Sequence, residues 1–364
     1  MSSTSPIDFV NFDFTCTTME ACFNAFDKNC DGYLDIDEFR ILCQALFRNN
    51  KGQTYETPEE HLRDIFQIFD LNHDGQIDKE EFTYCWNNWI KTIVRPISAI
   101  LIIDVQNDFI CGTLDIRKCP AKHNGEDILQ PINNLLEKID FDAVFYSFDW
   151  HPMDHVSFLD NINLRKLHES SPITVDNVQL YDTVIFDGDP PMKQRMWPRH
   201  CVQNTWGSEL HKDLKVVENA VKIYKGTNPE VDSYSAFWDN SKLTDTKLDA
   251  QLKLRNITDV YICGVAYDVC VGATAVDAIS SGFRTILLDD CSRGVDLQDI
   301  ERTKNHVVKN HGIVVDSDRV KNMVEGNDRR PELGYKSALN LKKNKNQPLK
   351  LPLYLTAYKL FQFS

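Results

Sequence analysis

The sequence lacks any apolar run of the ~18 residues that a membrane-spanning helix requires. Its start, "MSSTSPIDFVNFDF", has neither the basic region nor the apolar stretch of a secretion signal. Basic residues are in the minority, with 40 Lys and Arg against 54 Asp and Glu, and the net charge of −14 argues against nucleic-acid binding through the chain as a whole. The 11 cysteines show no regular spacing, so they do not indicate a disulfide framework. These absences predict a cytoplasmic protein, with nuclear access left open, that has no integral membrane segment.

What the chain does contain is enough material for two domains. It has 364 residues, of which 42% are hydrophobic and 26% are charged, so it can bury a sizeable core. We expect an N-terminal domain over residues 1–95, a second domain over 96–325 and a separate tail over 326–364. Part of the acidic excess is expected to bind cations.

An internal repeat marks the first domain. "FDKNCDGYLDIDEF" recurs as "FDLNHDGQIDKEEF", so two twelve-residue loops have the EF-hand pattern, and apolar residues at helical spacing flank them. The glycine at position 6 permits the sharp turn, and Leu34 and Ile77 are expected to pair the loops. The predicted Ca²⁺ ligands are Asp27, Asn29, Asp31, the carbonyl of Tyr33 and Glu38 in the first loop, and Asp70, Asn72, Asp74, the carbonyl of Gln76 and Glu81 in the second.

The second domain alternates apolar runs with helical stretches. Runs such as "ISAILIIDVQNDF" (97–109) and "DVYICGVAYD" (259–268) are typical of strands buried on both faces of a parallel sheet. The pattern predicts an α/β doubly wound parallel sheet preceded by an all-α paired EF-hand domain. Ligands of such sheets bind beyond the carboxyl ends of the strands. Four polar residues follow strands in this way: Asp104, Asp149, Lys225 and Cys270.

Several motifs occur together in one order: "IIDVQNDF", "DWHPMDHVSF", "WPRHCVQNTWGSEL", "YKG" and "GVAYDVC". Over about residues 97–320 the chain thereby resembles the nicotinamidases of the cysteine-hydrolase (isochorismatase-like) family. The EF-hand pair in front of this region is similar to the arrangement in insect and other invertebrate nicotinamidases. The resemblance implies a Cys, Asp, Lys triad, a bound divalent metal (usually zinc), nicotinamide as the substrate and a role in NAD salvage.

Cys270 is the expected nucleophile. It follows a strand and opens a helix, where the helix N-terminus is expected to lower the pKa of its thiol. Asp104 is expected to take the thiol proton and later to pass it to the leaving ammonia. The match to "YKG" makes Lys225 the cation that stabilises the thiolate. The resemblance assigns the oxyanion hole to the backbone N–H groups of Ala266 and Cys270 and implies a cis peptide between Val265 and Ala266.

The loop "DWHPMDH" offers the metal ligands. A carboxylate and imidazoles suit zinc, iron or manganese, and Asp149 and His151, two residues apart, can point the same way. The resemblance adds His200 as the third ligand. His155 is interpreted either as a further ligand or as a structural loop histidine. By resemblance Phe109 and Trp197 flank the pyridine ring, whose nitrogen occupies an open metal position.

The tail, residues 326–364, matches no part of the catalytic domain. Its lysines precede an apolar segment, and disorder is the default interpretation, with docking or weak membrane contact as alternatives. The basic residues concerned are Lys342, Lys343, Lys345 and Lys350.

Other functions remain open from sequence. The domain could be an amidase for another small amide or an isochorismatase-type hydrolase, or the protein could be a calcium sensor with an inactive hydrolase-like platform. A third hypothesis joins the two domains: calcium binding by the EF-hand pair modulates the amidase activity. Homo-oligomers are compatible with the resemblance.

Overall fold

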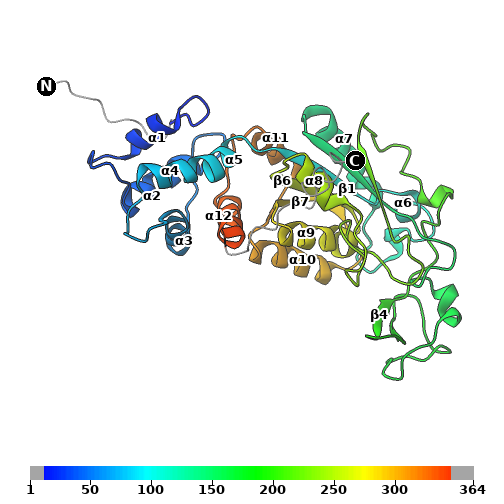
Figure 1. The fold of residues 1–364 in the computed structure, drawn as a ribbon. Helices are drawn as coiled ribbons and strands as arrows, with labels where there is room; N and C mark the ends of the chain where they lie inside the picture. The colour runs from blue at the N-terminus through cyan, green and yellow to red at the C-terminus, as the bar shows by residue number, and fades with distance from the viewer. Residues whose placement is uncertain (1–11, 346–364) are drawn as a thin grey trace, which may run out of the picture.

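The computed structural model describes residues 12–345, and the EF-hand region forms one end of the molecule (Figure 1). Its helices are α1 (Met19–Phe26), α2 (Ile36–Leu46), α3 (Glu59–Phe69) and α4 (Lys79–Cys85). The two loops pair between Leu34 and Ile77, whose backbone N–H groups each donate to the other's carbonyl oxygen at 2.9 Å. The expected pairing of the loops is therefore confirmed.

Capping boxes start the helices that follow the loops. Asp35 accepts from the Glu38 N–H at 2.8 Å while the Glu38 carboxylate accepts from the Asp35 N–H at 3.1 Å, and Asp78 and Glu81 repeat the arrangement. After α4 the chain continues through a π-helical segment, Trp86–Ile90, and α5 (Lys91–Val94). The last residue of each loop therefore also fixes the first turn of the next helix.

The second region is built on a six-stranded sheet in which every pairing is parallel. The strand order is β5-β2-β1-β6-β7-β8. The strands are β1 (Ser98–Ile103), β2 (Ala143–Asp149), β5 (Val221–Lys225), β6 (Asp259–Val265), β7 (Arg284–Arg293) and β8 (Ile313–Val315). Leu101 in β1 pairs with Phe145 in β2 and with Ile262 in β6, which fixes the register at the centre of the sheet.

Helices cover both faces of this sheet. Alternate residues of β1 point to opposite sides, so Ile100 and Ile102 join one core cluster and Leu101 and Ile103 another. The first cluster includes residues of α7 (Leu129–Lys138) and α11 (Ser317–Val324). The second includes residues of α8 (Leu248–Leu254), α9 (Gly272–Ser280) and α10 (Leu297–Lys309). The predicted doubly wound parallel sheet after an all-α EF-hand domain is confirmed.

Short elements were not foreseen from the sequence. They are the edge strand β8 and the antiparallel hairpin of β3 (Thr183–Phe186) and β4 (Met192–Arg195), which projects from the end of the molecule away from the EF-hands (Figure 1). Helical turns occur at α6 (Asn107–Ile110), Ile116–Lys118, Gly125–Ile128, Leu159–Leu164 and Trp206–Ser208. Elements of three to six residues carry too little periodicity to identify.

Disorder, the default expectation for the tail, is wrong for residues 331–345. This segment forms α12 (Pro331–Lys345), which lies between the EF-hand helices and α10 (Figure 1). Tyr335 and Ala338 are buried in the EF-hand core, and the Trp89 Nε1 donates to the Gly334 carbonyl oxygen at 2.8 Å. Packing against a neighbouring domain supplies the apolar burial that the isolated segment lacks. Lys350 and the apolar segment from 351 lie outside the described residues.

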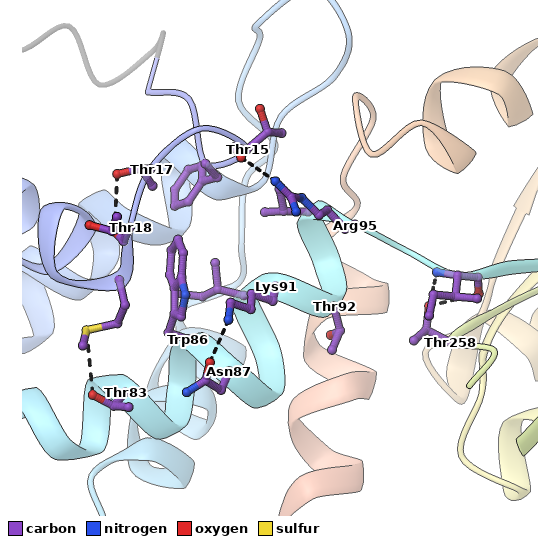
Figure 2. Close-up of a pocket in the computed structure, with 15 residues that line it drawn as sticks. Thr15, Thr17, Thr18, Thr83, Trp86, Asn87, Lys91, Thr92, Arg95 and Thr258 are labelled. Atoms are coloured by element: carbon purple, nitrogen blue, oxygen red, sulfur yellow. Dashed lines mark hydrogen bonds between the residues drawn. The ribbon is translucent and has the colours of Figure 1, made fainter. Parts of the chain in front are cut away.

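A groove of about 620 Å³ separates the EF-hand region from the start of the sheet domain (Figure 2). Its apolar lining includes Phe14, Met19 and Trp86, and Arg95 donates to the Thr15 carbonyl oxygen at 2.6 Å. None of the predicted catalytic or metal-binding residues lines it. Within residues 12–345 no helix has both the length and the apolar character needed to cross a membrane.

Candidate active site and metal centre

The sheet brings together four predicted residues that are far apart in the sequence. Asp149 and Lys225 are the last residues of β2 and β5, Asp104 follows β1, and Cys270 follows β6 within the π-helical turn Tyr267–Val271. Since β5, β2, β1 and β6 are neighbours, their carboxyl ends meet at one edge of the sheet. The four residues that follow or end these strands therefore lie close together, because their strands are neighbours in the sheet.

Lys225 lies at the centre of this cluster. Its Nζ is 2.9 Å from Asp104 Oδ2 and 3.3 Å from Cys270 Sγ, and it donates to the Ser233 carbonyl oxygen at 3.0 Å. It also pairs with Asp149, a contact that the sequence did not predict. Both partners of the Lys225 and Asp104 ion pair are fully buried. One buried ammonium thus contacts the thiol and two carboxylates.

Burial and charge set the protonation states. Burial alone would lower the pKa of Lys225, but Asp104 and Asp149 hold it well above its usual value. Burial raises the pKa of Asp104 by more than Lys225 lowers it. Burial likewise raises the pKa of the Cys270 thiol well above its ordinary value, and Lys225 opposes this rise. The direction is thus opposite to the lowered thiol pKa expected from sequence, and burial is its largest cause.

A hydroxyl orients Asp104. The Ser147 Oγ donates to Asp104 Oδ1 at 2.6 Å and accepts from the Asp104 N–H at 3.2 Å, and Asp104 itself has a positive φ of 49°. One carboxylate oxygen thus faces Ser147 and the other faces Lys225. Sequence reasoning missed Ser147, because serine in a buried strand is not distinctive.

The peptide between Val265 and Ala266 is cis, as the resemblance implies. Ala266 and Cys270 line the same chamber. The two residues whose N–H groups are predicted to hold an oxyanion therefore both line this chamber. Their role stays a prediction.

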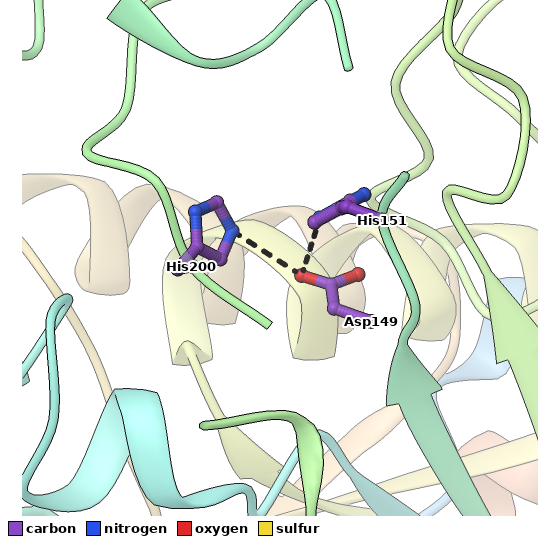
Figure 3. Close-up of side chains that lie close together, drawn as sticks. All are labelled: Asp149, His151 and His200. Carbon is purple, nitrogen blue, oxygen red and sulfur yellow. Dashed lines mark ion pairs between the residues drawn. The ribbon is translucent and has the colours of Figure 1, made fainter. Parts of the chain in front are cut away.

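The predicted metal ligands Asp149, His151 and His200 form one buried cluster (Figure 3). Asp149 Oδ2 is 3.4 Å from His151 Nε2 and 3.7 Å from His200 Nε2. Burial disfavours the ionised form of Asp149, but Lys225 and His151 hold its pKa well below the usual value. An ionised carboxylate and two imidazoles lie within 4.8 Å of one another.

The other imidazole nitrogens show that this donor set fits a metal. His151 Nδ1 is 2.9 Å from the Gly226 carbonyl oxygen, and His200 Nδ1 is 2.7 Å from the Pro198 carbonyl oxygen. A carbonyl only accepts hydrogen bonds, so each Nδ1 carries a proton, and each Nε2 is the nitrogen left to bind a metal. Gly226, with φ of 64°, permits the approach of His151, because a Cβ there would lie 2.3 Å from the ring.

His155 belongs to a different cluster. Its ligand atom lies within 4.8 Å of those of His151 and Asp232, and it is not grouped with Asp149 and His200. Its Nδ1 is 2.8 Å from Ser157 Oγ, while its buried Nε2 has no hydrogen-bond partner. Burial, assisted by His151, lowers its pKa to about 3, which keeps the ring neutral.

An aromatic chamber adjoins both clusters. Phe109 and Trp197 line it together with Asp149, His200 and Cys270, so the structure places both predicted ring-flanking residues beside the nucleophile. Two further lining residues, Asp232 and Tyr234, were missed by the sequence analysis because they follow Lys225 in a loop without a motif.

The calcium loops have the same internal geometry in both copies. Asp27 Oδ2 accepts from the Gly32 N–H at 3.1 Å, and Asp70 Oδ2 accepts from the Gly75 N–H at 3.0 Å, with φ near 88° at both glycines. Asn29, Asp31, Asn72 and Asp74 accept backbone N–H groups within their own loops, and Glu38 and Glu81 reach back to the loop start at 2.7 Å. Contributions from the Tyr33 and Gln76 carbonyls stay predictions.

Comparison with known proteins agrees with this architecture. Residues 98–319 match the isochorismatase domain and residues 17–85 match the EF-hand domain pair. A nicotinamidase of Escherichia coli is 36% identical over 205 residues, covering 56% of this chain and 86% of that protein. A nicotinamidase of Saccharomyces cerevisiae is 32% identical over 229 residues, covering 60% of this chain and 100% of that protein.

A solved nicotinamidase and pyrazinamidase structure from Acinetobacter baumanii superimposes with a TM-score of 0.52 at 32% identity, covering 62% of this chain and 98% of that one. These relatives are bacterial and fungal, so they give no support to the narrower resemblance to insect and other invertebrate nicotinamidases. The match to the isochorismatase domain covers more than half of the chain, and the protein is a hydrolase of the isochorismatase family that carries an N-terminal EF-hand pair.

Proposed function

We propose that the protein is a nicotinamidase, which hydrolyses nicotinamide to nicotinate and ammonia and thereby acts in NAD salvage. The observation that carries the proposal is the single chamber in which Cys270 and the Asp149, His151 and His200 cluster adjoin two aromatic side chains. The relatives named above, at about one-third identity, support the same substrate. An aromatic slot that is lined by two of the three candidate metal ligands and by a thiol suits a flat pyridine carboxamide.

The residues of the chain divide the chemistry between them. Asp104 takes the proton from Cys270 Sγ, and the thiolate attacks the carboxamide carbon while the N–H groups of Ala266 and Cys270 stabilise the oxyanion. Asp104 then donates the proton to the amide nitrogen, ammonia leaves and a thioester remains. Asp104 next deprotonates a water molecule, which hydrolyses the thioester and releases nicotinate and the thiol.

Lys225 serves this sequence electrostatically. The carboxylate and the thiol exchange one proton, and the fixed ammonium 3.3 Å from the sulfur favours the thiolate during attack. The high pKa of Lys225 keeps it charged throughout the cycle. When bound by Asp149, His151 and His200, a divalent metal such as zinc supplies a Lewis-acidic position for the pyridine nitrogen.

Ammonia release from nicotinamide by the purified protein tests the proposal. We expect the Cys270→Ala variant to lose more than about a thousandfold in rate, because no other residue supplies the nucleophile. Cys111→Ala, which removes an exposed thiol, is the matched control and should keep the wild-type rate. Retained turnover in a folded Cys270→Ala protein would refute the mechanism.

A panel of small amides separates the nearest alternative from this proposal. If another amide is turned over with a much higher kcat/KM than nicotinamide, the protein is an amidase for that compound. If the folded, metal-loaded protein hydrolyses none of them and still binds calcium, it is a calcium sensor with an inactive hydrolase-like platform.

Calcium modulation of turnover is part of the proposal, and α12 supports it. Trp89, on the helical segment after the second calcium loop, contacts α12 at Gly334, and Asn340 of α12 donates to the Gly282 carbonyl oxygen at 2.7 Å. Gly282 lies just beyond α9, the helix that follows Cys270. Coupling requires that calcium bind two catalytic states with different affinity. Identical kcat and KM with and without calcium, in zinc-buffered solution, would contradict it.

A further inference from the structure

The turn after Asp104 contains a buried amide with no role in the chemistry above. Gln106 is fully buried, and its side chain makes three hydrogen bonds. Nε2 donates to the Asp149 carbonyl oxygen at 2.8 Å and to the Ser208 carbonyl oxygen at 2.9 Å, while Oε1 accepts from the Asp149 N–H at 2.9 Å. Gln106 does not line the substrate chamber.

The contact with Asp149 has the form of a strand pairing. Asp149 is the last residue of β2, and the pairing of β1 with β2 ends three residues earlier, at Ile102 and Tyr146. Gln106 therefore satisfies both backbone groups of Asp149 on the side where β1 has already turned away. A carboxamide is the side chain that offers a donor and an acceptor in the same spacing as a peptide group.

The same turn reaches the second ligand-bearing segment. Asp108 Oδ2 accepts from the N–H of Cys201, the residue after His200, at 2.7 Å. Gly207 leaves room for this carboxylate, because a Cβ there would lie 2.0 Å from Asp108 Oδ2. The hydrogen bond from Gln106 to Ser208 holds the same segment further along the chain from His200. Gln106 and Asp108 thus join the loop that carries Asp149 and His151 to the loop that carries His200.

We propose that Gln106 is a positioning residue for the metal centre, which holds the Asp149 backbone so that its carboxylate meets His151 and His200. Asp149 is also drawn towards Lys225, so the direction of its carboxylate depends on where its backbone is held. Loss of the amide would leave the buried Asp149 N–H and C=O without these partners. Substitution of a residue that orients a metal ligand typically lowers metal affinity by 10- to 100-fold.

The test is the zinc dissociation constant of the metal-free full-length protein, measured by competition with a chromophoric chelator. Gln106→Glu keeps the shape of the side chain but replaces its donor with an oxygen that faces two carbonyl groups. We expect zinc affinity to fall about 10- to 100-fold. Gln106→Met, which removes the hydrogen bonds without adding a charge, should lower the affinity in the same direction and covers the case in which Gln106→Glu does not fold.

Asn107→Asp is the matched control. Asn107 is the next residue of the turn, and its Nδ2 donates to the Trp206 carbonyl oxygen at 2.8 Å without reaching a ligand residue. It should lose thermal stability as the Gln106 variants do, yet keep zinc affinity within about threefold of wild type, below the range for ligand-orienting residues.

Unchanged zinc affinity in both Gln106 variants, or an equal loss in Asn107→Asp, would overturn the positioning role. The inference rests on the proposed metal site, and the two fail differently. A wild-type protein that binds no zinc would overturn the metal site and this role together, whereas normal zinc binding by the Gln106 variants would overturn this role alone.

Discussion

The two candidate cation sites of this protein are built in opposite ways. Each calcium loop takes its ligands from twelve consecutive residues, so its geometry follows from one turn and one following helix. The Asp149, His151 and His200 cluster takes its ligands from a strand end and two loops, and it is buried. The first kind of site needs only its own segment to fold, whereas the second needs the order of the sheet. Local sites can therefore be read from spacing, and assembled sites cannot.

The strongest test of this contrast is His200→Ala. Removing one of three ligands should lower zinc affinity by more than about 100-fold, beyond the range for residues that only orient a ligand, and should abolish turnover. Calcium affinity should stay at the wild-type value, because the calcium loops share no residue with this cluster. Zinc competition and calcium titration on the same preparation measure both. A parallel fall in calcium affinity would show that loss of a zinc ligand disturbs the calcium loops.

The reverse change is expected to have a smaller effect. Glu81→Gln removes the bidentate carboxylate of the second loop and should weaken calcium binding there by about tenfold or more. The amide oxygen can still accept from the Asp78 N–H, so the capping box that starts α4 is retained. Exposed Glu80 supplies the control, and Glu80→Gln should leave calcium affinity unchanged. A lower zinc affinity in Glu81→Gln would contradict the view that each calcium loop is a local site.

The same contrast explains which parts of the fold and of the candidate site could be predicted from the sequence. Continuous apolar runs predicted buried parallel strands, and the residues after them, Asp104, Asp149, Lys225 and Cys270, do converge. The spacing of the calcium loops predicted the pairing of Leu34 with Ile77. Strand order, however, decides which strand ends are neighbours, and a single sequence does not encode it in any local pattern. That is why the joint contact of Lys225 with Asp149 and the roles of Gln106 and Ser147 were not foreseen.

The pKa of Cys270 shows a second limit of sequence reasoning. The pattern placed the thiol correctly before a helix, where the dipole lowers the pKa. It did not show that the thiol is buried beside two carboxylates, and burial is the largest cause of the raised pKa. The burial of a side chain depends on all the elements that pack around it, so it cannot be predicted from the neighbouring sequence. The segment that forms α12, for which disorder was the default expectation and docking an alternative, folds because of burial that its own sequence does not show.

The smallest expected effect concerns the joint between the two regions. Burial and the hydrogen bond to Asp64 raise the pKa of Tyr335 to about 12, and burial and Asp328 do the same for Tyr55. The folded state thus favours the protonated phenols. Their contribution to stability is complete below the unfolded pKa of about 10 and is lost as pH rises towards 12.

We expect the free energy of unfolding of the EF-hand region to fall between pH 10 and 12. Tyr335→Phe removes one titrating phenol and should flatten this decline, while Tyr33→Phe, at an exposed position in the first loop, should not. Denaturant unfolding followed by tryptophan fluorescence measures the change, because Trp89 contacts α12. An identical pH profile in wild type and Tyr335→Phe would exclude this titration as the cause.

The return of α12 to the EF-hand core also constrains the order in which the protein can be made. During synthesis the EF-hand helices leave the ribosome first, yet Tyr335 and Ala338, which complete their core, are among the last described residues to be translated. Phe47 and Gly334 pack so closely that a Cβ at residue 334 would lie 2.4 Å from the ring. Until α12 has emerged, the EF-hand core lacks Tyr335 and Ala338, and the apolar surface that these residues cover is open to non-native contacts.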